Sequence, residues 1–75
     1  MITRQQALAV STYKNRAHGF INDGYRCVFH VEDKGLFFAK FLHRNGNRIT
    51  LRLDTHDGVL SQITNGKEIF SAKMY

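Results

Sequence analysis

Short segments in which apolar and polar residues alternate fill the chain from residue 25 to its end, and glycine-containing turn sequences separate them. These turn sequences are Asp33-Lys34-Gly35, Asn45-Gly46, Asp57-Gly58 and Asn65-Gly66. Side chains on a strand alternate between two faces, and tight hairpins need residues that tolerate positive φ. The pattern predicts five consecutive antiparallel strands, at about residues 25–32, 36–43, 47–54, 59–64 and 67–73.

The beginning of the chain has a helical pattern instead. Thr3, with Gln6 three residues later, is typical of a capping box at a helix start. Apolar residues then recur at helical spacing, and Gly19 marks an expected end, which predicts a helix at about residues 3–18. A helix followed by a meander predicts an α+β fold, with one N-terminal helix packed across one face of a five-stranded antiparallel meander sheet.

The turn sequences also predict which residues share a face of the sheet. Three-residue loops at 33–35, 44–46 and 56–58 pair odd-numbered residues with odd-numbered ones. A shift of one residue would move the apolar set to solvent, so the hydrophobic pattern supports this register. The residues expected beneath the helix are Cys27, Phe29, Val31, Phe37, Ala39, Phe41, Ile49, Leu51, Leu53, Val59 and Ile63.

The last hairpin is compatible with two registers. Thr64-Asn65-Gly66 fits a three-residue loop, whereas Asn65-Gly66 alone fits a two-residue turn. The two-residue turn is preferred because it directs three apolar side chains inward, namely Phe70, Ala72 and Met74.

Even-numbered side chains of these registers lie on the sheet face that the helix does not cover. The candidate binding residues are Arg26, Phe38, Lys40, Arg44, Arg48 and Arg52, with Arg44 at the rim. Cations neutralise phosphates, and an exposed aromatic ring stacks on bases with about 1–3 kcal/mol per base. Two alternatives remain open at this point. Polar residues are common on the solvent face of any sheet, and the apolar side chains there (Val28, Phe38, Leu42, Leu60) suit a protein partner or a homodimer.

Length and charge narrow the classes of function. A chain of 75 residues predicts a single α+β domain that spans residues 1–75. The net charge of +5, from 11 basic and 6 acidic residues, favours anionic partners such as nucleic acid. Cys27 is the single cysteine, and neither a secretory signal nor an apolar run of roughly 20 residues occurs, so we expect a cytoplasmic protein with no membrane contact.

Catalytic and metal-binding motifs are not recognisable in the sequence. Glycine-rich phosphate loops, paired metal-binding cysteines and nucleophile elbows are absent. His56 lies between Asp54 and Asp57, but Asp57-Gly58 is already explained as a turn. We therefore expect a non-enzymatic protein that has no cofactor and no metal site.

The sequence favours a small non-enzymatic nucleic-acid-binding protein that prefers single strands and uses a basic, partly aromatic sheet face. The alternative is a small inhibitor or adaptor, of a kind found in bacteriophages and mobile elements, that binds a host enzyme acting on nucleic acid. Size and the lack of catalytic motifs are what support this alternative.

Overall fold

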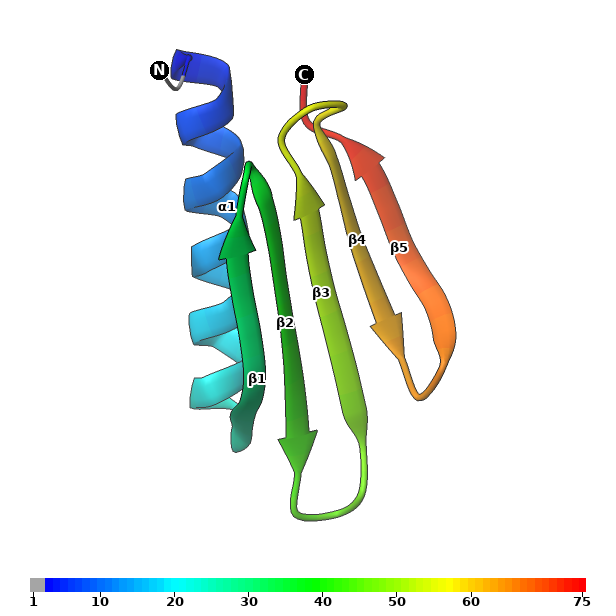
Figure 1. Cartoon of the computed structure of the whole chain (residues 1–75). Coiled ribbons are helices and arrows are strands. Elements are labelled where there is room, and N and C mark those ends of the chain that lie inside the picture. Colours follow the sequence, from blue (N-terminus) through cyan, green and yellow to red (C-terminus); the bar gives the residue numbers. More distant parts are fainter. Residues whose placement is uncertain (1–2) are drawn as a thin grey trace.

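The computed structural model describes residues 3–75 and consists of one helix and one five-stranded antiparallel sheet (Figure 1). Its elements are α1 (Arg4–Asn22), β1 (Tyr25–Asp33), β2 (Leu36–His43), β3 (Arg48–Asp54), β4 (Val59–Thr64) and β5 (Lys67–Lys73). Each strand pairs with its neighbours in the chain, so β1 and β5 are the two edges of an open meander. The predicted α+β fold class is thereby confirmed.

The start of α1 forms the capping box that the sequence predicts. The Thr3 hydroxyl accepts a hydrogen bond from the Gln6 backbone N–H at 3.1 Å, and the Gln6 side chain accepts one from the Thr3 N–H at 2.9 Å. Two otherwise unpaired donors of the first helical turn are satisfied in this way.

The end of α1 differs from the sequence prediction, because the helix continues through Gly19 to Asn22. Glycine inside a helix costs about 1 kcal/mol relative to alanine. The extra turn brings Phe20 against the core, with its ring centroid 5.4 Å from that of Phe41 and 6.0 Å from that of Tyr25. Packing of this ring offsets the cost of Gly19, and Gly24, with φ of 96°, supplies the left-handed residue after the helix.

The core lies between α1 and the covered face of the sheet, where β2 and β3 provide most of the buried side chains. Tyr13 packs on Phe37 with ring centroids 5.6 Å apart, and only 7% of Tyr13 is exposed. The buried apolar residues are Ala9, Tyr13, Phe37, Ala39, Phe41, Ile49, Leu51, Leu53 and Leu60.

Burial of Tyr13, together with the nearby Cys27 and Glu32, raises the pKa of its hydroxyl to about 12. An unfolded tyrosine ionises near pH 10, so the unfolded state loses this proton first as the pH rises. The free energy of unfolding should therefore be unaffected by this group below pH 10 and should fall between pH 10 and 12, by up to roughly 2–3 kcal/mol.

Urea unfolding of the wild type and of Tyr13→Phe across this range measures the effect. The phenylalanine variant should lack this part of the pH dependence, because it differs from the wild type only in this hydroxyl group. Parallel curves for the two proteins from pH 9 to pH 12 would contradict the assignment.

The β2–β3 pairing has the predicted register, whereas β1 changes face part-way along its length. β2 and β3 pair Phe38 with Arg52 and Lys40 with Thr50. The first hairpin turns through two residues, Lys34-Gly35, and not three, which shifts the pairing by one position.

A bulge at Val28 compensates for this shift, so that Tyr25–Cys27 keep the predicted faces while residues 29–32 are reversed. Phe29 and Val31 therefore lie on the open face of the sheet. His30 and Glu32 lie on the face covered by α1, which is opposite to the prediction for all four residues.

Strand β4 is also reversed relative to the prediction. Asp54 pairs with Val59, so the connection is a four-residue loop, Thr55–Gly58, and not the predicted three-residue loop. Leu60 consequently lies in the core with no exposed surface, and Gln62 is buried beside it. The two residues that the sequence pattern placed inside, Val59 and Ile63, lie on the open face.

Contacts made by Gln62 explain why this strand tolerates a buried amide. The Arg16 guanidinium on α1 donates a hydrogen bond to Gln62 Oε1 at 3.2 Å. The same guanidinium lies 4.2 Å from the centroid of the Phe70 ring on β5, a distance typical of a cation–π contact. Arg16 thus provides the hydrogen bond that the buried Gln62 amide needs and covers the core next to β4 and β5.

The last hairpin has the preferred two-residue turn at Asn65-Gly66, both with positive φ. An extra residue in β5, Ile69, shifts the pairing between Ile63 and Gln62. Phe70 and Met74 pack against the core as predicted.

Candidate nucleic-acid interface

The open face of the sheet, which α1 does not cover, contains most of the predicted binding residues. Arg26 pairs with Leu42, and Leu42 pairs with Arg48, so two exposed arginines flank the same apolar side chain. Strands in a sheet lie about 4.8 Å apart, which places the backbones of these arginines roughly 10 Å from each other. This part of the predicted arrangement is present in the structure.

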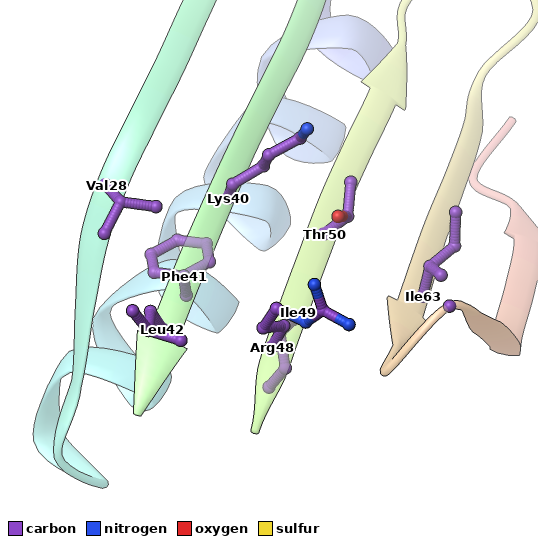
Figure 2. A pocket seen from close by; sticks show the side chains of 9 residues that line it. Val28, Lys40, Phe41, Leu42, Arg48, Ile49, Thr50 and Ile63 are labelled. Atoms are coloured by element: carbon purple, nitrogen blue, oxygen red, sulfur yellow. The ribbon is translucent and has the colours of Figure 1, made fainter. Parts of the chain in front are cut away.

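A shallow hollow of about 320 Å³ lies next to this row, between two cationic side chains (Figure 2). We call it the basic hollow. Its side chains on the open face are Val28, Lys40, Leu42, Arg48, Thr50 and Ile63. Figure 2 shows that they come from β1, β2, β3 and β4 and that the helix lies behind the sheet. An apolar floor between two cations suits a flat ligand that also carries negative charge.

An aromatic pair borders the basic hollow. The Phe29 and Phe38 rings contact edge to face, with centroids 6.1 Å apart and planes inclined by 74°. Lys40 Nζ lies 5.8 Å from the centroid of Phe38. Phe29 is 51% exposed, whereas Phe38 is half-buried. Phe29 is therefore the better stacking surface, and Phe38 supports it from the neighbouring strand.

Arg44, in the turn between β2 and β3, lines a second, smaller hollow together with Arg26 and His43. This hollow measures about 240 Å³ and lies at the same end of the sheet as Arg48. Four cationic side chains consequently gather near one end of the open face. Within residues 3–75, none of these four forms a salt bridge, so their charges are available to an anion.

Arg52 stands apart from this group. Its Nη2 lies 3.7 Å from Asp54 Oδ2, and the pairing brings Arg52 beside Phe38 and not beside Arg48. An exposed ion pair of this kind contributes about 0–1 kcal/mol to stability, but it neutralises part of the local charge. Asp33 and Asp54 also lie on the open face at this end, so Arg52 is the weakest of the predicted binding residues.

Phe29 is the binding-face residue that the sequence pattern assigned to the wrong side. The available signal was the Lys34-Gly35 dipeptide, since a two-residue turn there exposes Phe29. Lysine is uncommon at the first position of such a turn, which favours Asn, Asp or Gly, and Lys34 has an unusual φ of 50°. Leu60, which the sequence pattern placed on the open face, is buried in the core, so it does not belong to any apolar patch on the open face.

The loop around His56 has a structural role. His56 Nε2 lies 2.7 Å from the Lys34 carbonyl oxygen, and the Thr55 hydroxyl donates to the Gly35 carbonyl at 2.7 Å. The Tyr75 hydroxyl and the Gln6 side chain both donate to the Thr55 carbonyl. These bonds hold two hairpins, the helix start and the end of the chain together.

Neither a metal-binding cluster nor a comparison with known proteins indicates a further activity. In the part of the chain from residue 3 onward, no three His, Cys, Asp or Glu side chains are grouped so as to hold a metal ion. The same residues include no helix that combines the length and apolar character needed to cross a membrane. Comparisons with protein-family models, curated proteins and solved structures find no significant match to this chain.

Proposed function

We propose that this protein is a small non-enzymatic nucleic-acid-binding protein that holds single strands on the open face of its sheet. The observation that carries this proposal is the position of the Phe29–Phe38 pair beside Lys40 and the basic hollow. Stacking surfaces next to unpaired cations are the two components that single-strand binders combine.

Each component has its own role in the proposed complex. Arg26, Lys40, Arg44 and Arg48 neutralise phosphates, because all four are cationic and lack carboxylate partners within residues 3–75. The exposed ring of Phe29 receives a base, and such a contact contributes about 1–3 kcal/mol.

Single strands are favoured over duplexes because their bases are free to lie on an aromatic ring. A duplex reader would usually insert a helix into the major groove. Here the apolar stripe of α1, which includes Ala9 and Tyr13, is buried against the sheet.

Fluorescence anisotropy with labelled oligonucleotides tests the proposal. Single-stranded oligonucleotides should bind with micromolar or tighter affinity at low salt, and more tightly than a duplex of the same length. The slope of log K against log salt is about −0.7 for each phosphate neutralised on a single strand, which gives about −3 for four contacts. No binding to any oligonucleotide at low ionic strength would refute the proposal.

A second candidate function is inhibition of a protein that handles nucleic acid. The observation in its favour is the row of exposed apolar residues on β1, where Val28 and Phe29 are 52% and 51% exposed. Capture experiments on nuclease-treated lysate distinguish the two candidates. A protein partner that remains after digestion, together with no oligonucleotide binding by the purified chain, would favour the inhibitor.

A further inference from the structure

Strand β1 is an edge of the sheet whose central residues carry no protective charge. Positions 27–31 contain no Lys, Arg, Asp or Glu. Natural proteins usually protect exposed edges with charged side chains, bulges or short strands, because unpaired backbone groups invite pairing with another chain. The other edge, β5, also has its charged residues near its ends (Lys67, Glu68 and Lys73), but it is shorter than β1.

Exposed apolar side chains concentrate at the same edge. Val28, Phe29 and Val31 on β1 are 52%, 51% and 37% exposed, and Ile21 at the end of α1 is 46% exposed. Within residues 3–75, two other large apolar residues are comparably exposed, namely Leu8 and Ile69. Exposed apolar side chains along an unpaired edge are typical of an interface.

We propose that β1 pairs antiparallel with β1 of a second copy of this chain, around a two-fold axis at Val31. The two meanders then form one continuous sheet of ten strands, with both helices on the same face. Two-fold dimers are the commonest oligomers, and each contact in them occurs twice.

Hydrogen-bond complementarity selects this register. The bulge at Val28 leaves Phe29–Asp33 as the regular part of the strand. An axis at Val31 pairs His30 with Glu32 of the second copy, twice. An axis at His30 would place two imidazoles opposite each other, and an axis at Glu32 would place two carboxylates there. An imidazole N–H donates a hydrogen bond to a carboxylate that faces it across strands, whereas two facing carboxylates repel each other.

The surroundings of this pair support the same register. A hollow of about 430 Å³ lies between α1 and β1, and Lys14, His18, His30 and Glu32 are among the residues that line it. Glu32 of the second copy would enter the side of this hollow where His30 lies. On the open face, the two Val31 side chains meet at the axis, with each Phe29 within diagonal reach of Val31 of the other copy.

Sedimentation equilibrium on nuclease-treated protein, from micromolar to millimolar concentrations, tests the inference without reference to nucleic-acid binding. The wild type should form a dimer. Val31→Lys should give a monomer, because two ammonium groups would meet at the axis. Ile69→Lys on β5 is the matched control, since Ile69 is an exposed apolar residue on the opposite edge, and it should remain a dimer.

Substitutions at positions 30 and 32 then test the register of the proposed β1–β1 pairing. His30→Glu should weaken dimerisation by about tenfold, because it places two pairs of carboxylates opposite each other. Adding Glu32→Lys should restore the dimer, because each new carboxylate then lies opposite an ammonium group of the second copy. Circular dichroism should show that every variant is folded.

Three results would each overturn the inference. A wild type that stays monomeric up to millimolar concentration excludes the dimer. If Val31→Lys and Ile69→Lys dimerise with equal affinity, β1 is excluded as the interface. If the double variant His30→Glu with Glu32→Lys does not regain dimerisation, the axis at Val31 is excluded. Because nucleic acid is absent from all of these measurements, their failure would not affect the proposed function.

Discussion

Replacing Leu60 with threonine should destabilise the protein by roughly 3–4 kcal/mol, whereas the same replacement at Ile63 should cost only about 1 kcal/mol. Leu60 has no exposed surface and packs in the core, so threonine leaves a cavity and buries a hydroxyl group. Ile63 lies on the open face and is half-buried. Both positions are on β4 and threonine favours strands, so strand propensity does not explain the difference.

Urea unfolding followed by far-ultraviolet circular dichroism measures both variants. A domain of this length has a stability of only a few kcal/mol, so Leu60→Thr should be largely unfolded at 25 °C. Ile63→Thr should unfold cooperatively with a slightly lower midpoint. The register expected from sequence alone predicts the reverse order, and a greater loss at Ile63 than at Leu60 would contradict the structure.

Reversing the two charges of the basic hollow should nearly abolish binding of single-stranded nucleic acid. In Lys40→Glu with Arg48→Glu, two phosphate contacts are lost and two carboxylates face the anionic chain. We expect a loss of affinity on the order of 100-fold at low salt, together with a shallower salt dependence. Both side chains are exposed, so the fold should be retained.

Lys67→Glu with Lys73→Glu is the matched control, because it changes the net charge equally but acts on the far edge strand. Its affinity should fall only a few-fold, through the weaker overall field. Phe29→Leu tests the contribution of base stacking separately. It should weaken binding by up to about 100-fold without altering the salt dependence, because a ring is removed and no charge is changed. Equal losses in the two double variants would mean that binding depends on net charge and not on this site.

The fold class follows from local signals that reinforce one another. The Thr3–Gln6 capping box, the helical apolar spacing and the glycine turns each act over a few residues, so they are legible in the sequence. The strand positions and the β2–β3 register follow from them. Arg26, Lys40, Arg44 and Arg48 were predicted on this basis, and the structure places all four near one end of the open face.

The faces of β1 and β4 did not follow from the same signals. In β1, the two-residue turn at Lys34-Gly35 reverses the faces of residues 29–32, and the bulge at Val28 restores the predicted faces of Tyr25–Cys27; the apolar–polar alternation of the sequence reveals neither change. In β4, Leu60 and Ile63 are both apolar, so hydrophobicity does not decide which one is buried. These two strands determine that Phe29 joins Phe38 and that Leu60 leaves the surface.

By itself, the sequence determined the elements, their order and the positive charge of the open face, since these depend on residues close together in the chain. Tertiary structure alone decided which sides of β1 and β4 face the helix. Arg16 reaches across to Gln62 and Phe70, and the loop at Thr55 ties two hairpins together, so distant contacts select among registers that local turn preferences leave nearly equal in energy.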